Sequence, residues 1–378
     1  SAPGLYDHVL VLDFKSLYPA IIRTFKIDPM GLVEGLTDPD NAIEGFREAR
    51  FHRQHHFLPD IITSLWQQRD QAKKDNDQPR SQAIKILMNS FYGVLGSSGC
   101  RFYDPRLASS ITLRGHEIMQ TTADWIANAG YQVIYGDTDS LFVVLDDALD
   151  AAACRSIGNR LVSMMNDRWR KRVQTQFQLE CYLELEFETH FSRFLMPTIR
   201  GSESGSKKRY AGLVSAENDG SDRIIFKGLE NVRTDWTMLA RRFQQSLYDD
   251  VFHDRDPSTL IRQTVSQTLS GNHDADLVYR KQLRRKLADY VRNVPPHVRA
   301  ARLADDRNQT MGKPLRYQNR GWINYVITTA GPEPVEYRQS PLDYEHYIER
   351  QLKPVADAVL PFVGLSFDTV LSRQEALF

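Results

Sequence analysis

The sequence predicts an α+β protein with more than one lobe. The chain has 378 residues, which is more than a single hydrophobic core usually holds, and 41% of them are hydrophobic and 25% charged, as in globular proteins. Apolar runs of strand length alternate with amphipathic helices over roughly the first 230 residues, and helices dominate the remainder. We therefore expect a mixed helix-and-sheet region followed by a mainly helical region.

Apolar spacing predicts the first elements. A buried strand is expected at residues 9–12, ending at Asp13, followed by loops with one short helix at 31–51. Pro59 opens a helix, and residues 75–79 separate it from a second one. The expected apolar stripes contain Ile61, Ile62, Leu65 and Trp66 in the first helix and Ile84, Leu87, Met88 and Phe91 in the second. Two helices joined by a short polar turn predict an antiparallel hairpin.

The later elements are predicted in the same way. The expected segments are a loop at 93–99, a helix at 107–129, strands at 131–134 and 141–145, a helix at 150–172, a strand at 181–187, a loop at 200–207, and strands at 210–214 and 224–226. From Trp236 onward the pattern predicts helices with one strand at 322–328. No apolar run approaches the ~18 residues that a membrane span needs, so we expect no membrane segment.

Charge gives only a local signal. The 48 basic and 48 acidic residues cancel, but residues 279–302 carry eight Lys or Arg against one acid, Asp289. Such a run is either a solvated face or a nucleic-acid surface. The cysteines Cys100, Cys154 and Cys181 lie far apart without C-x-x-C spacing, so the sequence predicts no zinc ribbon. A sparse, odd set of thiols is typical of a reducing cytosol.

Two carboxylates stand where predicted strands meet turns. Asp13 ends the first strand, and Asp139 lies in the turn of the YGDTDS segment at residues 135–140, two residues after Asp137. Carboxylates close together at the rim of a sheet repel each other unless a cation neutralises them, and hard oxygen ligands favour Mg²⁺. The pattern therefore indicates a magnesium site.

Other interpretations of the YGDTDS segment stay open from its residues alone. An EF-hand loop does not fit, because Leu141 stands at its fifth position and no Gly at its sixth. A phosphoaspartyl nucleophile is also disfavoured by Leu141. An Asx-rich hairpin turn without a ligand is as compatible with the six residues as a metal site.

The predicted hairpin adds positive charge. Lys85, Asn89 and Tyr92 follow i, i+4, i+7 spacing, and Arg69 and Lys73 are also four residues apart on the partner helix. Arg69 and Lys85 are each eight residues from the turn at Asp77, which places them ~12 Å from the tip at a rise of ~1.5 Å per residue. Cations at matched height form a clamp for a polyphosphate. Solvent-exposed helix charges would not explain the Asn and the Tyr.

Five segments in order resemble the motifs of the family B DNA polymerases. They are DFKSLYPAII at 13–22, KILMNSFYG at 85–93, YGDTDS at 135–140, KKRY at 207–210 and KGLE at 227–230. The resemblance implies a polymerase right hand with an antiparallel-sheet palm, helical-hairpin fingers and a mainly helical thumb. It implies palm at residues 1–40 and 94–233, fingers at 41–93 and thumb at 234–378.

The resemblance also implies roles for individual residues. Asp13 and Asp139 would bind two Mg²⁺ ions with the Phe14 carbonyl, and Asp137 would be a less critical catalytic carboxylate. The residues that would bind the nucleotide are Ser16, Leu17, Tyr18, Arg69, Lys73, Lys85 and Asn89. Among them, Lys85 would also be catalytic, Tyr18 would reject a 2′-hydroxyl, and Asn89 would brace Tyr18. Lys207, Lys208, Arg209 and Tyr210 would contact the primer end.

The implied activity is template-directed DNA synthesis from deoxynucleoside triphosphates on a primer–template, in repair, damage-induced (SOS) synthesis or damage-tolerant replication. We expect a monomer in the bacterial cytoplasm, associated with the nucleoid. Because only twelve residues precede Asp13, we expect a chain without the family's exonuclease and N-terminal domains. The alternatives are a catalytically weak DNA- and clamp-binding fragment and, less favoured, a phosphoaspartyl hydrolase.

The last five residues, QEALF, resemble the short peptide by which bacterial polymerases bind the sliding clamp. Gln374, Leu377 and Phe378 match its pattern. Terminal apolar side chains on a tether can fill a hydrophobic pocket, so the sliding clamp is an expected partner.

Overall fold

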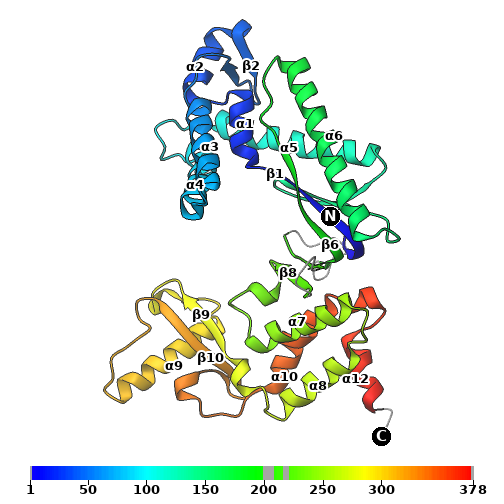
Figure 1. Cartoon of the computed structure of the whole chain (residues 1–378). Helices are drawn as coiled ribbons and strands as arrows, with labels where there is room; N and C mark the ends of the chain where they lie inside the picture. The colour runs from blue at the N-terminus through cyan, green and yellow to red at the C-terminus, as the bar shows by residue number, and fades with distance from the viewer. Residues whose placement is uncertain (1, 199–207, 216–220, 376–378) are drawn as a thin grey trace. The chain divides into compact units, whose positions relative to one another are not determined.

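The structure is a computed structural model that describes residues 2–198, 208–215 and 221–375. The chain divides into two compact units (Figure 1). The first comprises Tyr6–Ser192, and the second comprises Ala2–Leu5 with Arg193–Phe378. Within the described residues, no helix has the length and apolar character to cross a membrane.

The first unit mixes a sheet with helices. Its elements are β1 (Gly4–Phe14), α1 (Leu17–Phe25), α2 (Pro29–Thr37), β2 (Ala42–Glu44), β3 (Arg50–His52), α3 (Leu58–Lys74), α4 (Gln78–Leu95), α5 (Pro105–Asn128), β4 (Gln132–Asp137), β5 (Ser140–Val144), α6 (Ala151–Phe177) and the first part of β6 (Leu185–Met196). The sheet order in this unit is β4-β5-β1-β6. β1 runs antiparallel to β5, with Asp13 opposite Ser140, so the predicted strand and hairpin are confirmed.

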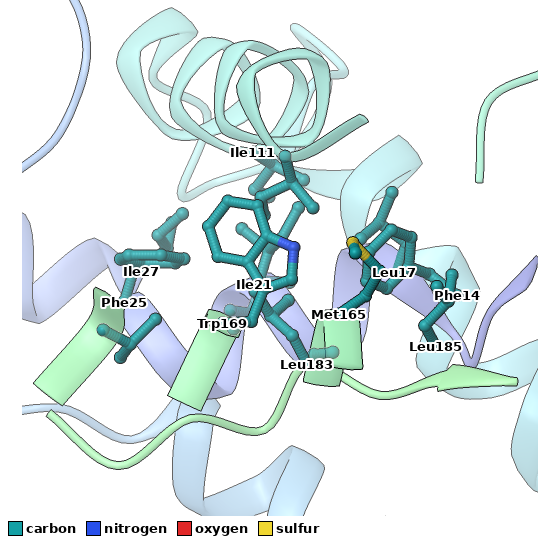
Figure 2. Packing of buried hydrophobic residues seen from close by; sticks show 14 of the residues in the cluster. Phe14, Leu17, Ile21, Phe25, Ile27, Ile111, Met165, Trp169, Leu183 and Leu185 are labelled. Atoms are coloured by element: carbon teal, nitrogen blue, oxygen red, sulfur yellow. The ribbon is translucent and has the colours of Figure 1, made fainter. Parts of the chain in front are cut away.

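The core of this unit lies beside β1 and α1. Phe14, Leu17 and Ile21 pack with Ile111 of α5 and Trp169 of α6, as Figure 2 shows. The Trp169 indole nitrogen donates a hydrogen bond of 2.9 Å to the Thr122 hydroxyl, so the one polar group of this ring is paired inside the core. The end of β1 and the start of α1 are therefore fixed by packing.

The hairpin of α3 and α4 forms as the sequence predicts, and its helices lie side by side (Figure 1). Asp77 caps α4 by accepting a hydrogen bond from the Arg80 backbone nitrogen, and Pro79 occupies its first turn. Ile62, Trp66, Ile84 and Met88 are buried. The prediction was wrong for Ile61 and Leu87, which are 48% exposed, because the hairpin buries a narrower stripe than an isolated amphipathic helix suggests.

Several boundaries differ from the prediction. α4 continues to Leu95, so the loop expected at 93–99 starts later, because Gly93 and its neighbours keep helical geometry. The strand expected at 181–187 is the strand Leu185–Met196, since Leu183 and Cys181 pack on the core before the strand begins. The loops expected at 31–51 contain α2 and the ribbon of β2 and β3.

The second unit contains the remaining strands of a six-stranded sheet that begins in the first unit, a separate three-stranded sheet, and the later helices. Its elements are the end of β6, β7 (Tyr210–Val214), β8 (Arg223–Lys227), α7 (Met238–Phe252), α8 (Ser258–Leu269), β9 (Tyr279–Leu283), α9 (Pro296–Thr310), β10 (Gly321–Thr328), β11 (Gly331–Pro334), α10 (Tyr344–Tyr347), α11 (Lys353–Asp357) and α12 (Phe367–Glu375). β7 pairs with β6 and β8, and β10 pairs with β9 and β11. The prediction of a single strand after Trp236 was therefore incomplete. β9 was missed because only its two end residues, Tyr279 and Leu283, are buried, and the three residues between them are polar or charged.

Two segments of the second unit meet at Gly228. Gly228 has φ +62°, and a Cβ there would lie 2.2 Å from the backbone oxygen of Lys208. Arg209 forms an ion pair with the buried Glu230, which also accepts a hydrogen bond of 2.8 Å from Gln244. The segments at Lys208 and Gly228 are thus held together by backbone contact and by a buried carboxylate.

We expect Gly228→Ala to lower the free energy of unfolding by about 2 kcal/mol or more, because the added Cβ meets backbone that cannot move aside and the left-handed φ disfavours alanine. Gly312→Ala is the matched control. Gly312 has φ +68° with nothing within 4 Å of its Cβ position, so only about 1 kcal/mol of backbone strain applies there. Urea denaturation of both variants measures the difference, and equal losses would show that the contact with Lys208 carries no weight.

Candidate active site

Asp13 and Asp139 are brought together by the pairing of β1 with the β4–β5 hairpin. Ser140 lies opposite Asp13, and its hydroxyl donates a hydrogen bond of 2.6 Å to the Asp13 carboxylate. One residue further, the Phe14 backbone nitrogen donates to the Asp139 carbonyl at 2.8 Å. The two acids thus share one edge of the sheet, as the sequence predicts.

The hairpin turn shapes the acidic segment. Thr138 has φ +53°, in the left-handed region that non-glycine residues seldom occupy. The Asp139 nitrogen donates to the Asp137 carbonyl at 2.5 Å, which closes the turn tightly. Asp137 is the last residue of β4, whereas the carbonyl of Asp139 pairs with Phe14 of β1, so the two acids are not equivalent.

The protein environment disfavours the ionised form of the carboxylates at this edge. Burial raises the pKa of Asp13 to about 6, and the charges of Asp139 and Glu188 add to the rise, whereas the Ser140 hydrogen bond and Lys85 oppose it. Burial also raises the pKa of Asp139, with further contributions from Asp137 and Glu188. A group of half-buried acids that repel one another is the environment that a divalent cation stabilises.

This donor set fits Mg²⁺. All the nearby donors are carboxylate, hydroxyl and backbone oxygens, which Mg²⁺ prefers. In the described residues, Asp13, Asp137 and Asp139 do not form a group whose ligand atoms all lie within 4.8 Å of one another. The three carboxylates are therefore spaced more widely than the ligands of a single ion.

Glu188 is an acidic residue that sequence reasoning missed. It lies on β6 beside β1, and its charge raises the pKa of both Asp13 and Asp139. The sequence held a signal for it, because Glu184, Glu186 and Glu188 alternate along one face of a strand. Lys15 pairs with Glu184 at 3.2 Å and approaches Glu186 at 3.8 Å, so this face of β6 turns toward the end of β1.

The hairpin presents cations toward the acids. Lys85 is exposed, and its charge lowers the pKa of both Asp13 and Asp139, so it lies near them. Arg69 is 9% exposed and its Nη1 donates to the Ser16 hydroxyl at 3.4 Å. Its Nε is buried and has no hydrogen-bond partner among the described residues. Lys73 and Asn89 lie on the exposed surface of the same hairpin.

Tyr18 lies between the acids and the hairpin. Ser16 has φ +48° and immediately precedes α1, so the backbone nitrogens of Leu17 and Tyr18 open the helix and have no partner within it. The Tyr18 ring contacts the Tyr92 ring at a centroid distance of 4.8 Å. A Cβ at Gly115 would lie 3.3 Å from the Tyr18 ring, so α5 closes the other side. Gly115 is a second contributor that the sequence did not reveal.

The remaining predicted site residues lie in the second unit. Lys208 and Arg209 precede β7, and Tyr210 begins it, with its ring 5.3 Å from the Phe194 ring. Lys207 lies outside the described residues. Gln374 belongs to α12, whereas Leu377 and Phe378 lie outside the described residues.

The basic run at 279–302 contributes to a concave surface. A cavity of about 620 Å³ in the second unit is lined by Thr234, Asp235, Arg280, Lys281, Gln282, Arg284, Arg285, Tyr290, His297 and Trp322. The Arg280 guanidinium lies 4.8 Å above the Trp322 ring. A basic, aromatic concavity favours the nucleic-acid interpretation of the run over a solvated face.

The chain belongs to DNA polymerase family B, whose model matches residues 2–361. It is 58% identical to DNA polymerase II of Escherichia coli (strain K12) over 100% of this chain and 48% of that polymerase. It is 29% identical to a DNA polymerase of Desulfurococcus sp. (strain Tok) over 96% of this chain and 46% of that protein. The chain thus spans about half the length of these curated relatives.

A solved structure of the family B DNA polymerase from Pyrobaculum calidifontis matches with a TM-score of 0.60 and 26% identity, over 93% of this chain and 45% of that one. The family predicted from the five motifs is confirmed. Within the family, the segment NVPPH at residues 293–297 resembles bacterial DNA polymerase II, and the 58% identity to the Escherichia coli protein agrees with this resemblance.

Proposed function

We propose that the chain catalyses template-directed DNA synthesis, adding deoxynucleoside triphosphates to a primer 3′-hydroxyl. The observation that carries the proposal is the edge where Asp13 and Asp139, with raised pKa values, lie near Lys85. The two acids would bind metal ions, and the neighbouring lysine would bind a phosphate group. Together they provide the charges that a nucleotide bound through metal ions requires. A phosphoaspartyl hydrolase needs no such clamp, and it would release phosphate from a phosphomonoester without a template.

The carboxylates of Asp13 and Asp139 and the carbonyl of Phe14 would hold two Mg²⁺ ions. Bound there, the ions would lower the pKa of the attacking hydroxyl and stabilise the charge of the leaving pyrophosphate. Asp137 adds negative charge beside Asp139, but it is not among the charges that raise the pKa of Asp13, so we assign it a smaller role. Glu188 raises the pKa of both ligands and so strengthens their demand for cations.

The nucleotide would be bound between α1 and the hairpin. The backbone nitrogens at Leu17 and Tyr18 open α1, and helix N-termini of this kind favour phosphate. Arg69 is held near Ser16 and keeps one buried nitrogen for a further acceptor. Lys73 and Lys85 would neutralise the outer phosphates. Asn89, on the same helix as Lys85, would brace Tyr18.

Tyr18 would distinguish deoxyribose from ribose, because Tyr92 and Gly115 fix its ring from two sides. We expect Tyr18→Ala to raise ribonucleotide incorporation relative to deoxynucleotide incorporation by about 10-fold or more, because the ring that would meet a 2′-hydroxyl is gone. Tyr18→Phe is the control, since it keeps the ring and should keep the discrimination. Single-nucleotide extension with paired rCTP and dCTP reactions measures the ratio, and unchanged discrimination in Tyr18→Ala would contradict the role.

DNA would be bound largely through backbone contacts. Lys207, Lys208, Arg209 and Tyr210 would lie at the primer end, where the Arg209–Glu230 pair fixes the segment. The basic concavity around Arg280 and Trp322 would contact the duplex phosphates without regard to sequence. We propose that the predicted palm (1–40 and 94–233), fingers (41–93) and thumb (234–378) are the functional parts of the chain.

The C-terminal residues Gln374, Leu377 and Phe378 would bind the bacterial sliding clamp, which fits a role in repair or damage-tolerant replication by a monomer in the cytoplasm, at the nucleoid. Deleting residues 374–378 is expected to abolish binding of the chain to purified clamp and to leave distributive synthesis unchanged. Fluorescence anisotropy of a labelled chain measures the binding. Retained affinity for the clamp would refute this part of the proposal.

A further inference from the structure

Three metal-ligating side chains of the first unit come together away from the acidic edge. They are His8 on β1, Cys154 on α6 and His190 on β6, and their ligand atoms all lie within 4.8 Å of one another. The His8 Nδ1 and His190 Nε2 atoms are 3.0 Å apart. Among the described residues, this is the only group of three or more His, Cys, Asp or Glu side chains that meets so closely.

The distances between the ligand atoms suit a tetrahedrally coordinated metal ion. Zn–N bonds of about 2.0 Å and Zn–S bonds of about 2.3 Å at tetrahedral angles place ligand atoms about 3.3–3.6 Å apart. The two ring nitrogens are already within a few tenths of an ångström of this value. A sulfur within 4.8 Å of both needs a shift of about 1 Å, which side-chain torsions supply without moving the backbone.

We propose that His8, Cys154 and His190 bind one Zn²⁺ ion through two imidazole nitrogens and one thiolate, with the fourth position left to water. Nitrogen and sulfur donors select zinc and disfavour Mg²⁺, so this site is chemically separate from the oxygen-lined edge at Asp13. A hydrogen bond between the two imidazoles would explain the 3.0 Å distance, but it would not explain the cysteine beside them.

Local structure fixes each ligand. His8 has φ +48° inside β1, a conformation that is unfavourable for a residue with a Cβ, while its carbonyl still accepts a hydrogen bond of 2.9 Å from Leu145. Asp150 caps α6 by accepting from the Ala153 nitrogen at 2.7 Å, and Cys154 follows, fully buried. The site therefore has a buried sulfur and two histidines from neighbouring strands.

The role follows from what the ion would connect. β1, α6 and β6 would be tied at one point, five residues along β1 from Asp13. The three ligands are not among the residues of the acidic edge at Asp13. The ion would therefore hold the palm elements together and would not contact the nucleotide. Binding of the ion should therefore change the thermal stability of the chain and the absorption spectrum of the bound metal.

The test uses the whole 378-residue chain, stripped of metal and kept reduced, with Zn²⁺ or Co²⁺ alone as the probe. We expect one Zn²⁺ per chain in competition with a chromophoric chelator, a higher midpoint of thermal unfolding with Zn²⁺, and a thiolate-to-cobalt charge-transfer band with Co²⁺. Cys154→Ser and His190→Gln should lose the band and the thermal shift. Cys181→Ser, at a half-buried thiol of the same unit that lies outside the cluster, is the control and should keep both.

Circular dichroism of each metal-free variant shows whether it is folded, and Cys154→Ser changes a single atom. A Co²⁺ spectrum without the thiolate band in the wild-type chain would overturn the proposal. The same holds if the band survives in Cys154→Ser or disappears in Cys181→Ser, because the sulfur would then come from elsewhere.

Discussion

Asp13→Asn and Asp139→Asn each reduce Mg²⁺-dependent primer extension by about 10³-fold or more, because several kcal/mol of metal-based stabilisation of the transition state depend on these charges. Asparagine keeps the size of the side chain and, at position 13, an oxygen that can accept the Ser140 hydrogen bond. It removes the charge that binds the cation. Asp137→Asn is the comparison and is expected to lose far less. Rapid-quench extension at saturating nucleotide measures all three variants.

Stability of the metal-free chain provides the control for Asp13→Asn. The pKa of Asp13 is about 6 in the folded chain and 3.8 in the reference state, so the folded state holds its proton more tightly. Its contribution to stability is full below pH 3.8 and is lost as the pH rises through 6. At pH 7.5 in EDTA, Asp13→Asn should therefore be as stable as the wild type or more stable by about 1–2 kcal/mol, after allowance for solvent screening.

These two measurements together separate chemistry from folding. Inactive but equally stable variants support the metal assignment. If Asp13→Asn retains nearly full extension, the metal site is elsewhere. If it unfolds at neutral pH without metal, the raised pKa does not describe Asp13.

Lys85→Ala lowers kcat by about 10²–10³-fold with a smaller change in KM, because a cation placed where charge develops acts mainly in the transition state. Lys85 is exposed on α4, so its removal leaves no cavity. The loss of Lys85 also raises the pKa of Asp13 and Asp139, since its charge now lowers both. The acidic limb of the activity–pH profile should therefore move to higher pH.

Lys74→Ala is the matched control, because Lys74 is an exposed lysine at the end of α3, beyond the predicted phosphate clamp. It should leave kcat and the pH profile unchanged. Equal losses in Lys74→Ala and Lys85→Ala would mean that the hairpin contributes only general positive charge. A larger KM with an unchanged kcat in Lys85→Ala would mean that Lys85 binds the ground state and the transition state equally.

Local patterns predicted much of the site. Asp13 and Asp139 were found because each stands where an apolar strand meets a turn, and the hairpin was found because two amphipathic helices flank a turn at Asp77. These features depend on residues close in sequence, for which periodicity and turn chemistry are direct signals.

The rest depends on contacts between distant segments. Glu188 acts on Asp13 only because β6 lies beside β1, and Gly115 contacts Tyr18 across helices that are far apart in the chain. Arg69 was expected in a phosphate clamp, and the sequence did not show that it is nearly buried because α3 packs against α1. The approach of Cys154 to two histidines is likewise a product of the fold, and C-x-x-C spacing could not reveal it.

The central claim is that this chain, at about half the length of its relatives, is itself a polymerase. The most direct test incubates the 378-residue chain with a 5′-labelled primer–template and Mg²⁺, offering one nucleotide at a time. Extension is expected only with the nucleotide complementary to the template, and it should require the template and be lost in EDTA. A chain that binds the primer–template but extends it with none of the four nucleotides would be a DNA-binding fragment and not a polymerase.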